Sequence, residues 1–398
     1  MEKLIITQME IRKKQALVTA LWRDGKIWNL ELAPPADRRL LGSIHVGKVQ
    51  KVLPDQKGAF VEIEGRLPCY FATDKNTGPL IRRGRRTGAL AAGDELLVQV
   101  TREALKTKAP SVSANLSFPG EYLVLTTENR MLGISSRISE PQRTRLRQLL
   151  TEVLPQERSY GVIVRTNAAQ AEKQQLLAEL SRLKDRMEEV LKKGSYAPCH
   201  TRIMDGDSRE TEAVKNCVWE NLEKIVTDDP EIYQKLLAFI AESYPGGQEK
   251  VELYEDPLLP LAKLFSLEAA VDGALNKKVW LRSGGFLAIE QTEACAVIDV
   301  NSGKHVEKRD TGEMAARINR EAAGEILRQI RLRNLSGIIL VDFINMNQEE
   351  QEQLLAMMRG LAKEDRITTR AVDVTALGIM ELTRKKEKKT LKEQLEEL

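Results

Sequence analysis

The chain has 398 residues, of which 42% are hydrophobic and 30% are charged. This length exceeds what one ordinary core organises, so we expect two to four packed units, and the apolar content excludes a disordered chain. Lysines and arginines number 61 and acidic residues 58, which gives a formal charge of +3. A balance this close to neutral does not itself indicate a polyanionic partner, so such a partner has to be argued from local clusters of charge.

The four cysteines lie far apart in the sequence and form no Cys-x-x-Cys pair. This spacing excludes the common zinc motifs and favours a reduced protein. The N-terminal segment alternates charged and apolar residues, unlike a secretory signal, and no stretch approaches the roughly 20 apolar residues of a membrane span. We therefore expect a cytoplasmic protein with no membrane partner.

Strand patterns dominate the N-terminal part of the sequence. Residues 3–33 contain three short apolar runs separated by polar turns, which predict strands. Residues 42–115 contain further alternating runs joined by tight turns. This second pattern favours a small antiparallel barrel.

The barrel segment carries the residue types that bind unpaired nucleic acid. Phe60 and Tyr70 offer stacking faces, and single strands bind where aromatic rings alternate with cations. An alternative interpretation places Phe60 in the barrel core and leaves Tyr70 as the exposed ring. Cations extend the positive surface unless each is only a solvated charge. They are Lys48, Lys51, Lys57, Arg82, Arg83, Arg85, Arg86, Lys106 and Lys108.

Strand and helix patterns alternate from Gly120 onward. The runs at 122–127 and 160–166 predict strands around a helix near 143–154. Further helices are predicted at about 168–193, 210–227 and 230–242, before a Pro-Gly-Gly break at 245–247.

Arg165 and Thr166 close the predicted strand YGVIVRT. A guanidinium fork and a hydroxyl at this position suit a terminal phosphate, which they hold by charge-assisted hydrogen bonds. The alternative is an arginine that pairs with a neighbouring carboxylate, which is the commoner arrangement at a strand end.

Two apolar runs in the last third of the chain each end in an aspartate, ACAVIDVNSGK at Asp299 and GIILVDFINM at Asp342. The segment between them, about 313–332, predicts a helix, so the three elements form a βαβ unit whose strands run parallel. The two aspartates are then expected side by side at the carboxyl ends of the strands, where open α/β sheets bind ligands. Asn301 lies two residues beyond Asp299 and points to the same side.

Two adjacent carboxylates repel each other and require a compensating cation. Oxygen ligands from Asp and Asn, with the remaining positions left to water and phosphate, are typical of Mg²⁺. An ion held there polarises a phosphodiester, so the chemistry indicated is phosphodiester hydrolysis. The alternative is that each aspartate only terminates its strand or caps the following turn. We expect three histidines to be surface residues without a metal role, His45, His200 and His305.

At these residues the sequence resembles the ribonuclease E/G family, and the resemblance covers nearly the whole length. It is carried by SGGFLAIEQTEACAVIDVNSGK, INREAAGEILRQIRLRNLSGIILVDFINM, GEYLVLTTENRMLGISSRI, YGVIVRT and LGIMELTRKK. The resemblance implies an endoribonuclease that hydrolyses single-stranded RNA with Mg²⁺ bound by Asp299 and Asp342. It also implies that Asn301 orients a carboxylate and the attacked phosphate, and that cleavage leaves a 3′-hydroxyl and a 5′-phosphate.

An α/β multidomain architecture is a second implication of the resemblance. A ribonuclease-H-like domain is interrupted by an OB-fold and a 5′-sensor domain, and a deoxyribonuclease-I-like catalytic domain follows. The ribonuclease-H-like parts map to 1–38 and 211–274 of this sequence, and the OB-fold RNA-binding domain maps to 39–115. The 5′-sensor domain maps to 116–210, and the catalytic domain with a C-terminal helical tail maps to 275–398.

Two groups of residues match family positions that contact RNA. One group matches the part of the OB-fold that binds RNA and consists of Phe60, Tyr70 and Lys108. The other matches a pocket for a 5′-monophosphate and consists of Val124, Arg165 and Thr166.

Two features depart from the family pattern. The family tends to have a basic residue shortly after a segment like KEDR, whereas this sequence has Thr368 near that position and Arg370 slightly displaced. The family also follows the LGIMELTRKK segment with a Cys-x-x-Cys pair that links a dimer through zinc, whereas this sequence continues EKKTLKEQLEEL. We expect a homodimer or higher oligomer without that zinc link, paired through a helical face of Leu391, Leu395 and Leu398. The alternative is a frayed and charged tail.

The residues and the resemblance together predict a magnesium-dependent endoribonuclease, and the resemblance further implies roles in rRNA processing and mRNA decay and a preference for 5′-monophosphorylated ends. An alternative from another class is a non-cleaving OB-fold RNA-binding protein, whose metal triad would be damaged. A third alternative, a deoxyribonuclease or other metal-dependent phosphoesterase, leaves the OB-fold and sensor elements without a role. The complete set of Asp299, Asn301 and Asp342 favours the endoribonuclease.

Overall fold

The computed structural model describes residues 1–35, 39–53, 55, 57–75, 81–83, 90–104, 108–127, 130–244, 246–303 and 311–398, except for the side chains of 81–83, 311 and 312. The chain divides into two compact units. The first unit comprises Met1–Asp37, Arg209–Ala241 and Gly246–Leu398, and the second comprises Arg38–Ser208 and Glu242–Pro245. Some residues considered above lie outside the described residues, namely Arg85, Arg86, Lys106 and His305, together with the side chains of Arg82 and Arg83.

A five-stranded sheet in the first unit has the strand order β16-β15-β1-β2-β3. β1 and β2 pair antiparallel along their lengths, and β15 adds to β1 in parallel. The strands predicted within 3–33 are confirmed, and their turns contain Arg12, Lys13 and Asp24 at positive φ. The bounds are β1 Glu2–Ile11, β2 Lys14–Arg23, β3 Lys26–Ala33, β15 Leu222–Thr227 and β16 Val251–Leu253.

The helix predicted over 210–227 is wrong in its second half. Helix α3 spans only Arg209–Lys215, and the segment that follows forms strand β15 between β1 and β16. Ile225 and Val226 pair with β1 on one side and β16 on the other. Strand pairing on both sides therefore outweighs the helical spacing of apolar residues, because sheet propensity depends mainly on neighbours.

The C-terminal helix α9, Leu391–Glu397, packs within the first unit. Leu391 and Leu395 are only 1% and 8% exposed and join the core that contains Leu30 and Leu32 of β3. Both interpretations of this segment, a pairing face and a frayed tail, are therefore wrong, because Leu391 and Leu395 are buried in their own chain and Leu398 packs, partly buried, against the same core. The other helices of this region are α4 Pro230–Ser243, α5 Leu261–Leu264 and α6 Leu267–Leu275.

A closed barrel forms part of the second unit, as predicted, although β6 and β9 pair in parallel and not antiparallel. Its strands run β4-β5-β6-β9-β8, and β4 also pairs with β8, which closes the sheet on itself. The interior is filled by alternate residues such as Val49, Val61, Phe71 and Val98. The bounds are β4 Ile44–Leu53, β5 Gly58–Glu62, β6 Pro68–Ala72, β8 Glu95–Arg102 and β9 Ser111–Ser113, with β7 Ile81–Arg83 and β14 Arg202–Met204 at the margins.

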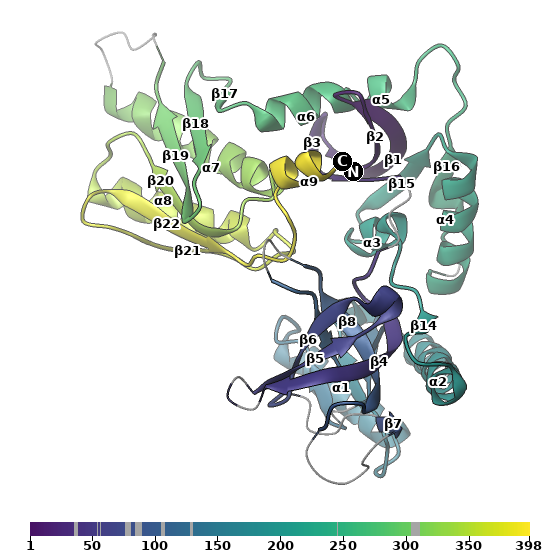
Figure 1. Cartoon of the computed structure of the whole chain (residues 1–398). Coiled ribbons are helices and arrows are strands. Elements are labelled where there is room, and N and C mark those ends of the chain that lie inside the picture. The colour runs from purple at the N-terminus through teal and green to yellow at the C-terminus, as the bar shows by residue number, and fades with distance from the viewer. Residues whose placement is uncertain are drawn as a thin grey trace. The chain divides into compact units, whose positions relative to one another are not determined.

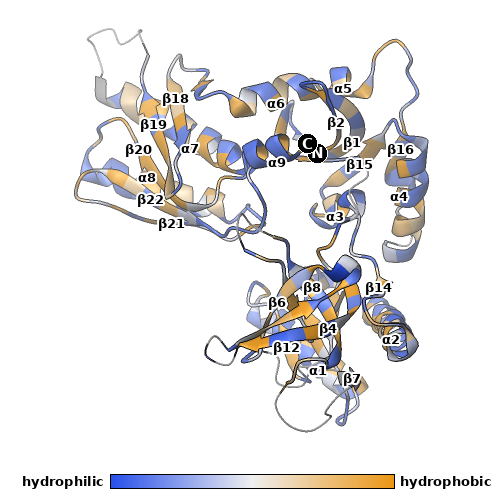
Figure 2. Ribbon diagram, in the orientation of Figure 1, coloured by the Kyte–Doolittle hydropathy of each residue, from blue (hydrophilic) through white to orange (hydrophobic). Residues whose placement is uncertain are grey.

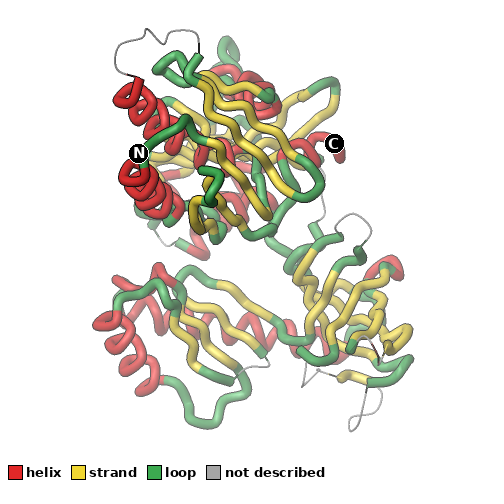
Figure 3. Tube along the Cα trace, turned by 90° about the vertical axis from the view of Figure 1, so that its left-hand side faces the viewer, coloured by secondary structure: helices red, strands yellow, loops and turns green. Residues whose placement is uncertain are grey.

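A four-stranded sheet, in the order β10-β11-β13-β12, completes the second unit. Figure 3 shows it and the barrel as two separate groups of strands. The long helix predicted from about 168 begins at Lys173, because 166–170 form a 3-10 turn. The bounds are β10 Ser117–Pro119, β11 Leu123–Thr126, β12 Leu132–Ile134, β13 Gly161–Val164, α1 Glu140–Val153 and α2 Lys173–Tyr196.

A six-stranded sheet in the first unit has the order β17-β18-β19-β20-β22-β21. The βαβ prediction is confirmed, since β19 and β20 run parallel and the helix α7 lies between them in sequence. Helices α7 and α8 lie beside one face of this sheet (Figure 1). The bounds are β17 Lys278–Trp280, β18 Phe286–Gln291, β19 Cys295–Asn301, α7 Thr311–Leu332, β20 Gly337–Asp342, α8 Gln348–Ala362, β21 Thr369–Val374 and β22 Ile379–Arg384.

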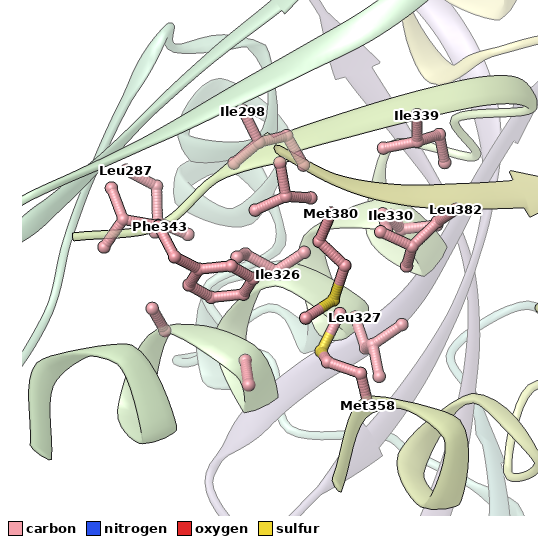
Figure 4. Close-up of a cluster of buried hydrophobic side chains, with 14 of the residues drawn as sticks. Leu287, Ile298, Ile326, Leu327, Ile330, Ile339, Phe343, Met358, Met380 and Leu382 are labelled. Atoms are coloured by element: carbon pink, nitrogen blue, oxygen red, sulfur yellow. The ribbon is translucent and has the colours of Figure 1, made fainter. Parts of the chain in front are cut away.

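The two faces of this six-stranded sheet differ sharply. Figure 4 shows Ile298, Phe343 and Met380 gathered with helix residues such as Ile326 and Met358 in the buried core. Among the residues that the structure describes, no helix covers the residues that alternate with them, and Ile338 on that side is 52% exposed. We call this second side the open face.

Hydropathy follows the same division between core and surface. Strands of the barrel are coloured mainly hydrophobic, whereas α2 and α4 alternate hydrophilic and hydrophobic residues (Figure 2). In the described part of the chain, no helix combines the length and the apolar composition needed to cross a membrane.

Candidate active site

The two predicted aspartates lie side by side on the open face. Asp299 of β19 and Asp342 of β20 are register partners on adjacent parallel strands. Partners of this kind are about 5 Å apart and project their side chains to the same face. Both side chains are exposed, while the residues that flank them, Ile298 and Val341, are buried in the core.

Asn301 joins this pair from the end of β19. Its Nδ2 donates a hydrogen bond of 2.7 Å to Oδ2 of Asp299. Glycines permit the tight backbone contacts around it, because a Cβ on Gly285 would lie 2.7 Å from the Asn301 carbonyl oxygen and a Cβ on Gly303 would lie 2.4 Å from the Gly284 carbonyl oxygen. The SGG and NSG segments of the sequence therefore meet here and fix the end of β19.

The donor set suits a hard divalent cation. Within the described residues, no ion pair involves Asp299 or Asp342, so the repulsion between these neighbouring carboxylates is not balanced by a protein cation. The same part of the chain holds no cluster of three or more His, Cys, Asp or Glu residues arranged to bind a metal. Two carboxylates with an amide leave most coordination positions to water and substrate, which is typical of Mg²⁺ rather than of a closed zinc or calcium site.

An aromatic and cationic cluster on the same open face was not predicted from the sequence. Trp280 of β17 pairs with Phe286 of β18, and Phe286 pairs with Asn301. The Nζ of Lys278 lies 4.1 Å from the ring centroid of Trp280 and 3.6 Å from that of Phe286. The alternation of Lys278, Val279 and Trp280 was the available signal, because it turns the first and third residues to one face of a strand.

The aromatic residues predicted to bind RNA are brought together on the outside of the barrel. Phe60 and Tyr70 are register partners on β5 and β6, with ring centroids 6.4 Å apart in an edge-to-face arrangement. Both are partly exposed, whereas their neighbours Val61 and Phe71 are buried. The alternative that placed Phe60 in the barrel core is therefore wrong.

Lys108 lies close to this pair in the fold, because β9, which begins three residues after it, pairs with the strand of Tyr70. Its side chain is exposed, and the carbonyl of Pro110, two residues on, accepts a hydrogen bond of 2.8 Å from the Tyr70 backbone N–H. Lys51, the register partner of Phe60, is exposed as well. Cations and rings thus share one outer surface of the barrel.

The residues predicted to bind a 5′-phosphate meet at one end of the four-stranded sheet. Arg165 follows β13, and its backbone N–H donates to the Tyr122 carbonyl at 2.8 Å. The Arg165 guanidinium donates to the carbonyl of Gly120, so part of its hydrogen-bonding capacity is used by the protein itself. Thr166 is exposed, and its hydroxyl lies 3.1 Å from that of Ser135. Val124 lies on the neighbouring strand β11, opposite Ile163.

Glu179 of α2 organises the turn before β11, and the sequence analysis did not identify it. It is 5% exposed, and its carboxylate accepts hydrogen bonds from three successive backbone N–H groups, those of Glu121 at 2.8 Å, Tyr122 at 2.9 Å and Leu123 at 2.7 Å. A Cβ on Gly120 would lie 2.4 Å from this carboxylate, so only glycine allows the close approach. A shallow cavity of about 350 Å³ adjoins the same sheet and is lined by Ser135 and Ile163 among others.

The expectation that the histidines are surface residues is wrong for His45. Its side chain is 0% exposed, and its Nε2 lies 2.7 Å from the hydroxyl of Ser43. Burial, reinforced by the nearby Arg202 guanidinium, lowers the pKa of His45 to about 4. His200 is half-buried, with Nε2 3.7 Å from the Glu62 carboxylate.

Comparison with known proteins gives one family match. The family model described as the Ribonuclease E/G family matches residues 117–387. This range contains both aspartates of the open face, the residues around Arg165, and Glu179.

Individual proteins are similar over a longer range. Ribonuclease G from Haemophilus influenzae is 31% identical over 384 residues, which cover 94% of this chain and 78% of that protein. Ribonuclease G from Escherichia coli is 30% identical over 388 residues, which cover 92% of this chain and 77% of that protein. Ribonuclease E from a Nostoc species is 32% identical over 384 residues, but there the match covers 94% of this chain and only 55% of the longer protein.

Proposed function

Because the chain belongs to the Ribonuclease E/G family, we propose that it cuts single-stranded RNA by hydrolysing phosphodiester bonds with Mg²⁺ held at Asp299 and Asp342. The observation that carries the proposal is the register pairing of these aspartates on adjacent parallel strands, with Asn301 bonded to Asp299 at 2.7 Å. An exposed pair of uncompensated carboxylates attracts a cation together with the phosphate that the cation recruits.

The residues of the site have two roles, binding the metal ion and orienting its ligands. Asp299 and Asp342 would hold the ion through carboxylate oxygens. When bound, Mg²⁺ polarises the phosphodiester and neutralises the charge that develops on the departing oxygen. Asn301 fixes the rotation of the Asp299 carboxylate through its donated hydrogen bond, and its remaining N–H is available to the attacked phosphate.

The outer surface of the barrel is the proposed binding surface for unpaired RNA. Phe60 and Tyr70 offer ring surfaces to bases, and Lys108 offers a cation to the backbone, in the manner of an OB-fold. We extend the proposal to the predicted ribonuclease-H-like, OB-fold, 5′-sensor and deoxyribonuclease-I-like domains, whose boundaries stay predictions. Support comes from the closed barrel and from the sheet that carries the aspartates.

A preference for 5′-monophosphorylated ends is a further part of the proposal. Val124, Arg165 and Thr166 would contact the terminal phosphate, with Ser135 beside Thr166 as an additional hydroxyl. Arg165 already donates to Gly120, so it would offer the phosphate only its other N–H groups. Arg370, the displaced basic residue, is exposed on the open face of the six-stranded sheet.

The cellular setting is proposed from the same family relationship. We place the chain in the cytoplasm, acting in rRNA processing and mRNA decay, and as a homodimer or higher oligomer without a zinc link. The buried leucines of α9 do not provide that oligomer interface. The competing function, RNA binding without cleavage, retains the barrel surface but gives the exposed aspartate pair no role.

The test uses a 5′-monophosphorylated single-stranded RNA oligonucleotide, incubated with the intact chain in the presence of Mg²⁺ or of a chelator. We expect cleavage only with Mg²⁺, and none by the Asp299→Asn variant. Binding of the RNA by both proteins without any cleavage would replace this proposal with the RNA-binding function. Cutting of a matched DNA oligonucleotide at an equal rate would instead favour a general phosphoesterase.

A further inference from the structure

We propose that Lys278, Trp280 and Phe286 form a stacking site for an unpaired base close to the phosphate that is cut. The inference rests on the proposed function, since it adds a base-binding subsite to the same sheet. Phe286 is the register partner of Asn301, and Trp280 is the register partner of Phe286. Trp280 therefore lies roughly 10 Å, or two strand spacings, from Asn301. A nucleoside adjoining the cut phosphate covers such a distance.

Exposure sets Trp280 apart from an ordinary core aromatic. Its side chain is 65% exposed, although it lies on an ordered strand. Its ring centroid is 5.4 Å from that of Phe286, with an angle of 59° between the planes, so Phe286 supports the Trp280 ring from the side in a tilted arrangement. Exposed rings of this kind stack on bases of any sequence, because every base has a π-face.

Lys278 adds the charge that a nucleotide requires. Its ammonium contacts both rings, and within the described residues it forms no ion pair. Two nearby cations already form ion pairs, because Lys26 lies 3.5 Å and Arg328 lies 2.5 Å from the carboxylate of Glu325. Lys278 is thus the cation here that a phosphate can engage without displacing a carboxylate.

A cavity also adjoins Trp280 and Lys278. Trp280 and Lys278 border a cavity of about 520 Å³ in the first unit, whose lining includes Trp22 and Phe265. This volume lies within the range of small-molecule sites. Residues of α7, Arg328 and Gln329, also line this cavity, so it lies beside the edge strand β17 on the side of the helices, next to the stacking site and not within it.

The loop that connects the two rings is held in place. Backbone N–H groups of Arg282 and Ser283 donate hydrogen bonds of 2.6 and 3.1 Å to the carboxylate of Glu321 on α7. Leu281 between them and Trp280 is buried. Because the loop is already ordered, binding a base costs little conformational entropy.

The experiment removes one base from the RNA and, separately and together with it, the ring of Trp280 from the protein. A single-stranded RNA cut at one site is prepared with one abasic nucleotide at successive positions around the cut, and kcat/KM is measured for the intact chain, Trp280→Ala and Trp280→Phe. Tyr196→Ala is the matched control, because Tyr196 is an 83% exposed ring in the second unit. Cross-linking is measured in parallel with 5-iodouridine RNA and the Asp342→Asn variant, so that binding is read without cleavage.

We expect one abasic position to lower kcat/KM about tenfold for the intact chain. On normal RNA, Trp280→Ala should lower kcat/KM about tenfold. On RNA that is abasic at the sensitive position, kcat/KM of Trp280→Ala should fall no further, and Trp280→Phe should behave almost as the intact chain does. The inference would be overturned, while the proposed function stands, if the losses in kcat/KM from the abasic nucleotide and from Trp280→Ala multiply, or if Trp280→Ala leaves kcat/KM unchanged. If the intact chain cuts no RNA, the proposed function fails, and the position of the cross-link then tests the stacking site by itself. Attachment at Trp280 or Phe286 supports the stacking site, and attachment only elsewhere rejects it.

Discussion

Asp299 and Asp342 of the first unit and Glu179 of the second unit are carboxylates in opposite surroundings. The two aspartates are exposed, and within the described residues the one side-chain hydrogen bond to their carboxylates comes from Asn301. Glu179 is 5% exposed and accepts three backbone hydrogen bonds. A buried carboxylate whose oxygens are occupied contributes to folding, whereas adjacent exposed carboxylates retain lone pairs for a ligand. The comparison separates residues that perform chemistry from residues that shape the protein around it.

The largest effect is expected at the aspartate pair. Asp342→Asn removes one of two charges that attract the metal ion, so the cleavage rate should fall on the order of 10³-fold. The variant should keep its unfolding midpoint in chelator, because it relieves repulsion rather than breaking a stabilising contact. Single-turnover cleavage and urea unfolding measure the two quantities.

Asp373→Asn is the control for that variant, since Asp373 is an exposed aspartate on β21 of the same sheet. It should leave the cleavage rate unchanged. A parallel loss of activity and folding in Asp342→Asn would place this residue with Glu179 and abolish the distinction between the two regions.

Glu179→Gln should lower the free energy of unfolding of the second unit by about 2–3 kcal/mol, because three backbone N–H groups lose a charged acceptor. Glu189→Gln on the same helix α2 is the control, as Glu189 is exposed and forms an ion pair with Lys193 on the helix surface. Urea unfolding should show a shifted midpoint for the first variant and none for the control. An unshifted midpoint for Glu179→Gln would mean that the buried carboxylate is not structural.

The smallest effect concerns pH and His45. Because burial lowers its pKa from 6.5 to about 4 in the folded chain, protonation favours the unfolded state. The stabilisation is complete above pH 6.5 and is lost as the pH falls toward 4. This group alone should cost about 2 kcal/mol between pH 7.5 and pH 5.

His45→Gln isolates that contribution. Unfolding of the variant and of the intact chain is compared at both pH values, and the difference between them removes the titration of other groups. The variant should lose less stability at low pH than the intact chain. An identical loss would show that the buried imidazole does not set the acid sensitivity of the barrel.

Sequence patterns predicted the elements that depend on local periodicity. The strands at 3–33, the barrel strands and the parallel pair that ends in Asp299 and Asp342 all have apolar alternation or apolar runs that determine which face is buried. The strand at 222–227 was missed because its stability comes from β1 and β16, which are distant in sequence. The burial of α9 was missed for a similar reason, since its leucines pack against β3.

The candidate site shows the same limit. Asp299, Asn301 and Asp342 were predictable because a βαβ unit brings strand ends together. Trp280 and Glu179 were missed, Trp280 because its place depends on the pairing register of three consecutive strands, and Glu179 because its partners lie more than 50 residues away in the chain. Trp280 reaches the site only through the register of β17, β18 and β19, and Glu179 only through the packing of α2 against the turn before β11.

The central claim, that a metal ion at Asp299 and Asp342 acts on the RNA phosphate, is tested most directly by replacing a nonbridging oxygen of the cut phosphate with sulfur. Mg²⁺ prefers oxygen ligands, whereas Mn²⁺ accepts softer ones. The account predicts that the intact chain cuts normal RNA with either ion, but cuts the sulfur-containing RNA at least about tenfold faster with Mn²⁺ than with Mg²⁺. Asp299→Asn should cut neither RNA. Equal cleavage of the sulfur-containing RNA with both ions, or cleavage in the presence of a chelator, would contradict the account.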